Sequence, residues 1–255
     1  MRFDNLLHRL IGWCEEKTDE YIRKYDQQKG TVGFRPYLVT GELRFKLASL
    51  LEQDFADYDA FAAAVLDLMD VHYDYALKNL PNRTQELMVE RTKQSFLAFF
   101  ESLAPDFQGE PPKHYWRVIM GKEAGIIAER YRLQWEFERN SYWYPLSNCG
   151  RGEKLFLMQE HVERRKKELE QLLGLPERKM YCFGESSYPV LFVEETNELE
   201  FYSGMECAYA DKDFTWMIYC SHEQTVTFVG SIVPTIKKLF APEKELWNQF
   251  EWGMT

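Results

Sequence analysis

One stretch of the chain, from Lys179 to Val229, has the pattern of a β-sheet and limits the possible folds more than any other part of the sequence. Short runs rich in β-branched and aromatic residues alternate there with turn residues, which is typical of strands. The candidate strands are residues 180–183, 188–194, 198–202, 214–220 and 225–229. The last two have the spacing of a hairpin, so we expect a mainly antiparallel sheet of about 4–5 strands.

The run 214–220 is apolar on both of its faces. A strand of this kind lies inside a sheet that is covered on both sides. Most of the chain before Lys179 has the pattern of helices, so helices are expected to provide the cover. The sequence therefore predicts an α+β fold in which a mostly helical N-terminal half precedes the sheet.

Apolar residues at helical spacing predict helices over residues 4–28, 41–53, 57–79 and 82–103, and further helices over 113–135 and 153–173. The stretch 104–112 is rich in proline and glycine, so it is the first candidate for a boundary. We predict a helical region over residues 1–140 and an α+β region over 141–255. The sequence leaves open whether the two regions form one compact unit.

The charge balance excludes some partners. The chain has 31 Lys+Arg against 41 Asp+Glu, a net charge of −10, so the molecule as a whole repels a phosphate backbone and direct nucleic-acid binding is not expected. The five cysteines contain no Cys-x-x-Cys pair, which indicates a reducing compartment. The N-terminus lacks a signal-peptide pattern, and no apolar run approaches the roughly 20 residues of a membrane helix, so we expect a cytoplasmic protein that does not bind membranes.

Common catalytic signatures are missing from the sequence. There is no phosphate-binding glycine loop, and the segment Gly184-Glu185-Ser186-Ser187-Tyr188 lacks the final glycine of a nucleophile elbow. None of the five histidines has the spacing of a zinc-protease or di-iron motif. We therefore expect no metal and no cofactor, and a binding role is favoured over an enzyme.

Acidic residues crowd one segment of the predicted sheet around the single Lys212, and they could form a docking surface for a basic partner. A solvated face is the alternative interpretation. The residues are Glu194, Glu195, Glu198, Glu200, Glu206, Asp211 and Asp213.

A second hypothesis is a ligand pocket, or the site of a hydrolase-like enzyme, between the helical half and the sheet, with aromatic walls. Cys182, Glu185 and His222 are the candidates for chemistry there. The alternatives are a buried structural thiol for Cys182 and an ordinary turn residue for His222. The full set is Trp143, Tyr144, Cys182, Glu185, Tyr188, Trp216, Tyr219 and His222.

The segment 216–228, with the sequence WMIYCSHEQTVTF, resembles the C-terminal part of many small uncharacterised bacterial proteins, including immunity proteins encoded beside polymorphic toxins. The resemblance implies a non-enzymatic bacterial protein that blocks a toxin by binding it. A basic toxin, for example a nuclease, would suit the negative charge of this chain. Oligomeric state is left open.

Overall fold

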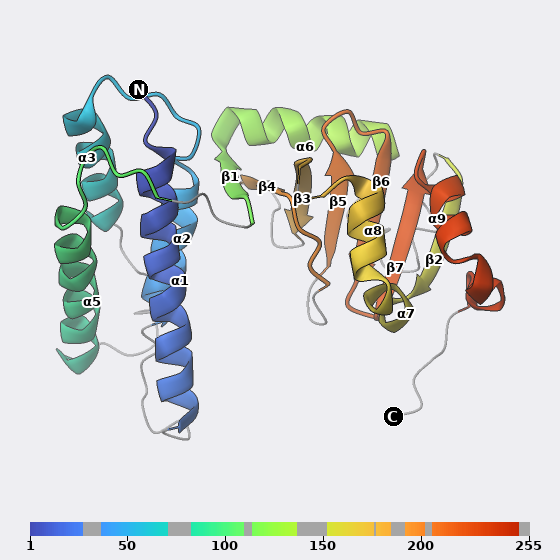
Figure 1. Cartoon of the computed structure of the whole chain (residues 1–255), viewed down its shortest axis with the longest axis horizontal. Helices are drawn as coiled ribbons and strands as arrows, with labels where there is room; N and C mark the ends of the chain where they lie inside the picture. Colours follow the sequence, from blue (N-terminus) through green and yellow to red (C-terminus); the bar gives the residue numbers. More distant parts are fainter. Residues whose placement is uncertain are drawn as a thin grey trace. The chain divides into compact units, whose positions relative to one another are not determined.

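A computed structural model of the chain describes residues 1–27, 37–70, 83–109, 114–136, 152–175, 177–184, 192–201 and 206–249 (Figure 1). The chain divides into two units, Met1–Lys113 and His114–Thr255. The division directly follows the proline-rich stretch 104–112 and comes well before residue 140. Each unit carries half of the net charge, −5.

The first unit is helical in the residues described. Its helices are α1 (Asp4–Gln27), α2 (Tyr37–Ala48), α3 (Tyr58–Asp67), the short 3-10 helix η1 (Leu68–Asp70) and α5 (Arg83–Glu101). Leu7 and Leu10 of α1 are fully buried, and Trp13 packs against Phe96 and Phe99 of α5. The side chain of Asp57 caps α3 by accepting a hydrogen bond from the backbone N–H of Ala60 at 2.8 Å. Aromatic and leucine packing therefore forms the core of this unit.

The second unit contains a seven-stranded sheet in the order β1-β4-β3-β5-β6-β7-β2. Every neighbouring pair of strands is antiparallel. The strands are β1 (Trp116–Met120), β2 (Lys154–Met158), β3 (Met180–Gly184), β4 (Phe192–Thr196), β5 (Cys207–Asp211), β6 (Trp216–Ser221) and β7 (Thr225–Gly230). The predicted α+β class with N-terminal helices and an antiparallel sheet is confirmed, and the sheet has more strands than the 4–5 expected.

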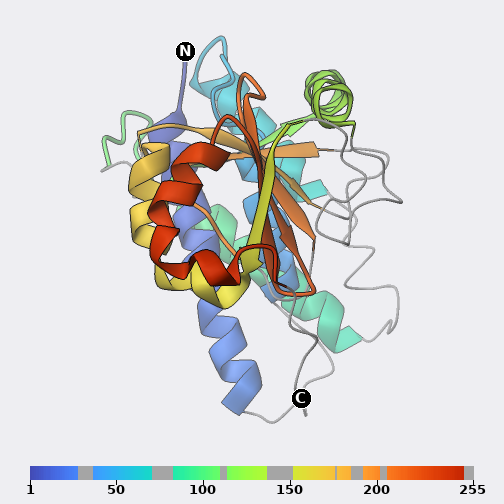
Figure 2. The same cartoon turned by 90° about the vertical axis from the view of Figure 1, so that its right-hand side faces the viewer.

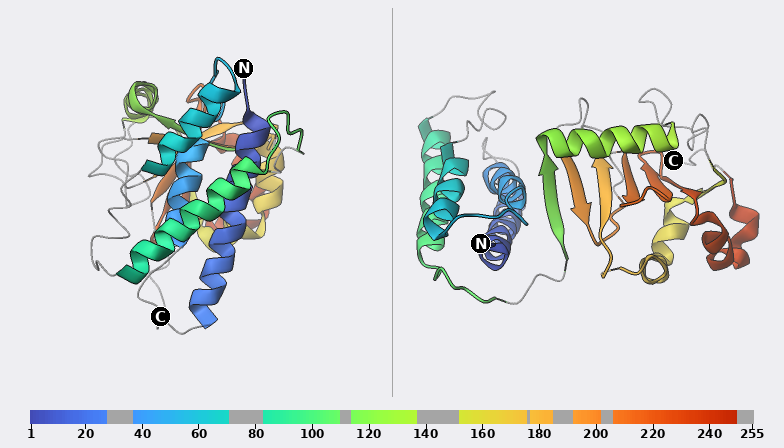
Figure 3. Two further views of the ribbon diagram at one scale, coloured as in Figure 1. Left: turned by 90° about the vertical axis from the view of Figure 1, so that its left-hand side faces the viewer. Right: turned by 90° about the horizontal axis from the view of Figure 1, so that it is seen from above.

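Helices cover both faces of this sheet (Figures 2 and 3). Helix α6 (Gly121–Trp135) packs on one face, and α7 (Gln159–Arg164), α8 (Lys166–Leu173) and α9 (Val233–Leu239) pack on the other. The 3-10 helix η3 (Ala241–Leu246) follows α9. Strand β6 lies between β5 and β7 and is almost wholly buried, as its apolar pattern predicts.

Two strands lie where helix was predicted. A helix was expected over residues 113–135, but this range begins with β1 and only its second part forms α6. In the same way, the range 153–173 begins with β2 and continues as α7 and α8. These strands form the two edges of the sheet, where β1 pairs with β4 and β2 pairs with β7. The pattern failed because a short apolar run before a helix fits either structure, and only pairing with a distant strand decides between them.

The strand predicted over residues 198–202 is also wrong in the residues described, since Glu198–Phe201 form no strand. The backbone of Glu200 is hydrogen-bonded to the Tyr209 side chain instead. The Tyr209 hydroxyl donates to the carbonyl of Glu200 at 2.8 Å and accepts from its N–H at 3.0 Å. Strand β5, which carries that tyrosine, is a third strand that the sequence pattern does not predict. A side chain thus replaces a neighbouring strand as the hydrogen-bond partner of this segment.

Candidate functional site: a buried carboxylate at the end of the sheet

Glu206 immediately precedes β5, at the end of the sheet where β6 finishes and β7 begins. Side chains alternate along a strand, so Glu206 shares a face with Ala208 and Ala210, which belong to the core under α6. The residue is only 4% exposed. A carboxylate is rarely buried to this extent without specific partners.

The partners of Glu206 come from the end of β6 and the turn after it. The hydroxyl of Tyr219 donates to Glu206 Oε2. The hydroxyl of Ser221 and the backbone N–H of His222 both reach Glu206 Oε1, at 3.1 Å and 3.2 Å. The imidazole Nδ1 of His222 forms an ion pair with the same oxygen. Strand pairing thus supplies four contacts to one carboxylate.

Glu223 closes the cluster on the opposite side of the imidazole. Its Oε1 lies 2.8 Å from His222 Nε2, and its Oε2 lies 2.8 Å from the hydroxyl oxygen of Ser221. The serine has a single hydroxyl proton, so it can donate to only one of the two carboxylates at a time. We call Glu206, Tyr219, Ser221, His222 and Glu223 the Glu206 centre.

The charge state of the Glu206 centre follows from its geometry. Burial raises the pKa of Glu206, while the backbone N–H and positive charge of His222 oppose that rise. A neutral imidazole has only one N–H, yet a carboxylate lies at each ring nitrogen of His222. A neutral imidazole can therefore donate a hydrogen bond to only one of the two carboxylates.

The neighbouring strand β7 adds two buried hydroxyl groups to the same face of the sheet. Thr225 lies directly opposite Ser221 in the strand register, and Thr227 lies directly opposite Tyr219. Directly opposite residues share a face, with Cβ atoms about 4.5–5.5 Å apart. Both threonines are fully buried, and within the described ranges neither hydroxyl oxygen has a hydrogen-bond partner. Such orphaned hydroxyls are uncommon.

The Glu206 centre does not have the geometry of serine-based acyl transfer. That chemistry requires the nucleophilic hydroxyl to be hydrogen-bonded to the imidazole. The hydroxyl of Ser221 instead contacts the carboxylates of Glu206 and Glu223. What the centre can do is hold a proton or a cation, since one ligand atom from each of Glu206, His222 and Glu223 lies within 4.8 Å of the others.

Three buried thiols lie on the opposite face, which α7, α8 and α9 cover. Cys182, Cys207 and Cys220 come from the adjacent strands β3, β5 and β6, and Cys207 lies directly opposite Cys220. Hydrogen bonds from the other two thiols lower the pKa of Cys207 to about 4. The hydrogen bond to Cys207 and burial raise the pKa of Cys182 and Cys220. Cys182, a candidate for chemistry, is thus a core residue separated from the Glu206 centre by the sheet.

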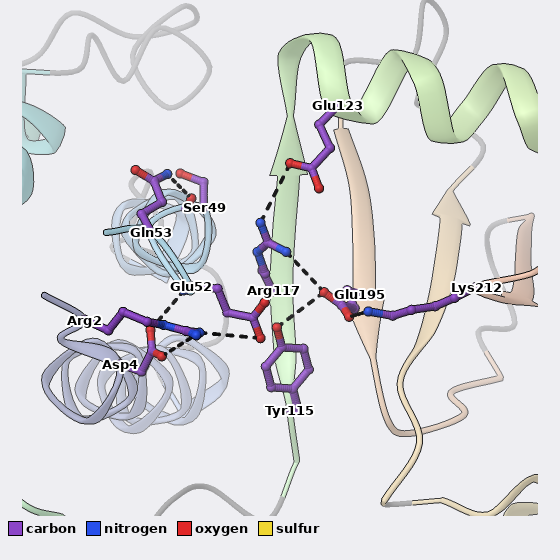
Figure 4. A network of polar contacts seen from close by, with 10 residues as sticks. All are labelled: Arg2, Asp4, Ser49, Glu52, Gln53, Tyr115, Arg117, Glu123, Glu195 and Lys212. Atoms are coloured by element: carbon purple, nitrogen blue, oxygen red, sulfur yellow. Dashed lines mark hydrogen bonds and ion pairs between the residues drawn. The ribbon is translucent and has the colours of Figure 1, made fainter. Parts of the chain in front are cut away.

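A second buried carboxylate, Glu195 of β4, has fixed cations as partners (Figure 4). Its Oε2 lies 3.4 Å from the guanidinium of Arg117 and 3.4 Å from the hydroxyl of Tyr115. Its Oε1 pairs with the ammonium of Lys212. Arg117 also faces Glu123 at 3.9 Å. This network ties β1, β4 and the β5–β6 turn together.

The predicted acidic surface is dispersed in the fold. Glu195 and Glu206 are buried and are therefore not available to a partner. Glu198 pairs with His114 at 3.0 Å and with Lys166 at 3.5 Å. Asp211 organises the β5–β6 turn by accepting from Thr215 and Trp216. The three that remain are Glu194, which is half-buried, and Glu200 and Asp213, which are exposed.

The predicted pocket residues divide between several places. Tyr219 and His222 meet at Glu206. Cys182 and Trp216 belong to the core on the opposite face. Trp143, Tyr144, Glu185 and Tyr188 lie outside the described residues. Glu206 itself was assigned to the acidic surface, because it lies 16 residues before His222 and only the pairing of β5 with β6 brings them together.

Comparison of the chain with models of protein families, with curated proteins and with solved structures gives no match. The similarity of the segment 216–228 to immunity proteins therefore stays an expectation from the sequence. Among the helices of the described ranges, none has the length and apolar character needed to span a membrane.

Proposed function

We propose that this protein acts by binding a basic partner protein, as the similarity of the segment 216–228 to immunity proteins implies, and that the turn 221–224 is part of the contact. The observation that carries the proposal is the position of this turn. It presents Glu223 and His222 at the end of the sheet with side chains 26% and 43% exposed, above the buried carboxylate of Glu206.

The chemistry of the turn suits a cationic partner. A lysine or arginine of the partner can pair with Glu223 at the rim, where charge complementarity mainly speeds association. The partly exposed imidazole next to it provides a further polar contact. The contact falls within the very segment that resembles immunity proteins. The exposed acidic residues Glu200 and Asp213 add to the general attraction for a basic protein.

The test is affinity capture from the native lysate with the tagged chain at low and high salt, followed by binding kinetics with the purified partner. We expect one basic protein that is retained at low salt and weakened at high salt. Glu223→Lys should weaken its retention far more than the matched charge reversal Asp213→Lys on the β5–β6 turn. Loss of retention in Asp213→Lys alone would move the contact to the acidic segment. Absence of any basic partner would overturn the proposal.

A second candidate function, binding of a small polar molecule, is favoured by the orphaned hydroxyls of Thr225 and Thr227. A ligand that hydrogen-bonds to both would satisfy two groups that are otherwise costly to bury. A thermal-shift screen of metabolites tests this candidate. A stabilising ligand whose effect disappears in Thr225→Val supports it, and a screen without any stabilising compound counts against it.

A further inference from the structure

We propose that the second unit binds one divalent transition-metal ion, of the class that zinc represents, through Glu206, His222 and Glu223. One ligand atom from each residue lies within 4.8 Å of the others. Imidazole and carboxylate groups are ordinary ligands of zinc, with ligand distances of about 2.0–2.2 Å. One ring nitrogen of His222 can bind the ion, so the carboxylate that now lies at the other nitrogen has to turn toward that ion.

A second observation points to a ligand at the same place. Thr225 lies opposite Ser221 on the same face of the sheet, and Ser221 contacts both carboxylates of the site. The Thr225 hydroxyl is fully buried and has no hydrogen-bond partner within the described ranges. A zinc ion with three protein ligands keeps an open position that water fills. Such a water would give this hydroxyl the partner that it lacks.

The residues around the ligands already hold them in place. Tyr219 and the backbone N–H of His222 fix the carboxylate of Glu206. The carbonyl of Gln224 accepts a hydrogen bond from the backbone N–H of Gln159 at 2.7 Å, which anchors the turn that carries His222 and Glu223. Groups that orient metal ligands in this way contribute strongly to affinity. The exposed sides of His222 and Glu223 leave a path for the ion to enter.

The proposed metal site goes beyond partner binding, because the isolated chain is expected to bind the ion. The experiment is calorimetric titration of the full chain with zinc chloride, together with the visible absorption of the cobalt(II)-loaded protein. We expect one ion per chain. Loss of a side chain that only orients a ligand typically costs about 10- to 100-fold in affinity, so His222→Ala should weaken binding by at least about 100-fold.

The matched control is His114→Ala. His114 is also exposed and also pairs with a carboxylate, Glu198, at 3.0 Å, so it reports any adventitious surface binding. Glu223→Gln provides a second ligand variant in case His222→Ala does not fold, and it should weaken zinc binding and alter the cobalt spectrum. Zinc binding that is absent in the wild type, or unchanged in the folded ligand variants, would overturn the proposal. Failure to find a protein partner would leave these results unaffected.

Discussion

Glu195 and Glu206 are two buried carboxylates on the same face of one sheet, and they differ in what compensates their charge. Their side chains are 1% and 5% exposed. Glu195 pairs with Arg117 and Lys212, which carry fixed charges. The described contacts of Glu206 are with the hydroxyls of Tyr219 and Ser221 and with the imidazole of His222. The comparison teaches that equal burial does not mean equal surroundings: two cationic side chains hold the first carboxylate, whereas the second contacts an imidazole that it shares with Glu223.

The physical reason lies in the cost of burying charge. Moving a carboxylate out of water costs several kcal/mol even after the protein relaxes. The guanidinium of Arg117 and the ammonium of Lys212 offset this cost for Glu195 within the fold. Glu206 is held instead by hydroxyl groups, one backbone N–H and one imidazole. The two buried carboxylates therefore differ in the groups that offset their burial.

Glu195→Ala is expected to have the largest effect on stability. It leaves Arg117 without its buried partner, and breaking a buried ion pair from one side typically costs about 3–5 kcal/mol. Chemical denaturation of the purified variant measures this loss. The matched control is Asp213→Ala, an exposed carboxylate, which should change stability by less than about 0.5 kcal/mol. A loss below 1 kcal/mol in Glu195→Ala would mean that the network is not structural.

Tyr219→Phe should have an intermediate effect. It removes one hydrogen-bond donor from the buried carboxylate of Glu206, at an expected cost of about 1–3 kcal/mol. Tyr181→Phe is the control, because the ring of this half-buried tyrosine stacks on Phe214 and stays in place. Urea unfolding of both variants makes the comparison. Equal losses in the two would show that the Tyr219 hydroxyl contributes nothing special to the Glu206 centre.

Thr225→Val should act in the opposite direction. It replaces a buried hydroxyl that has no partner in the described part of the chain with a methyl group of similar shape, so the metal-free protein should gain up to about 1 kcal/mol. The same change should lower zinc affinity if a metal-bound water contacts the hydroxyl. Denaturation without metal and zinc titration test the two halves separately. A clear destabilisation without metal would mean that the hydroxyl is satisfied.

The dependence of stability on pH should differ between Glu206 and the partly exposed Glu20. The pKa of Glu206 is raised from 4.5, so the favourable contribution of its protonation is present below that value and is lost as the pH rises through the folded-state pKa. Hydrogen bonds from Lys17 and Lys24 lower the pKa of Glu20 to about 2. Its contribution is present above 4.5 and is lost as the pH falls towards 2.

These opposite signs can be measured with Glu206→Gln and Glu20→Gln between pH 2 and pH 7, by comparing each with the wild type. The Glu20 effect should be the smallest of all, about a few tenths of a kcal/mol, since Glu20 and Lys17 are partly exposed, Lys24 is exposed, and solvent screens the pairs. Identical pH profiles for the two variants would contradict the assigned environments.

Local patterns were enough to predict the helical character of the first unit and the β6–β7 hairpin, although α2 lies at Tyr37–Ala48 and part of the helix expected over 57–79 falls outside the described residues. The run 214–220 is apolar on both faces and predicts an interior strand, and β6 lies inside the sheet between β5 and β7. Strands β1 and β2 were missed because each is a short run joined directly to a helix. Their identity depends on pairing with β4 and β7, which no local period encodes.

The candidate site could be predicted only in part. Tyr219 and His222 were selected because an aromatic residue and a turn histidine are common in binding sites. Glu206 was assigned to an exposed surface, since a glutamate in a charged segment gives no sign that it is buried. Its position two residues before Ala208 and four before Ala210 would have placed it on the inward-facing side of β5, but β5 itself was not predicted.

The most direct test of the contrast between the two carboxylates is the melting temperature of Glu195→Gln and Glu206→Gln with and without zinc chloride, measured beside the wild type. We predict that zinc raises the melting temperature of the wild type and of Glu195→Gln by the same amount, although the latter starts lower, and that it leaves Glu206→Gln unchanged. A zinc shift that persists in Glu206→Gln, or one that disappears in a folded Glu195→Gln, would contradict the account.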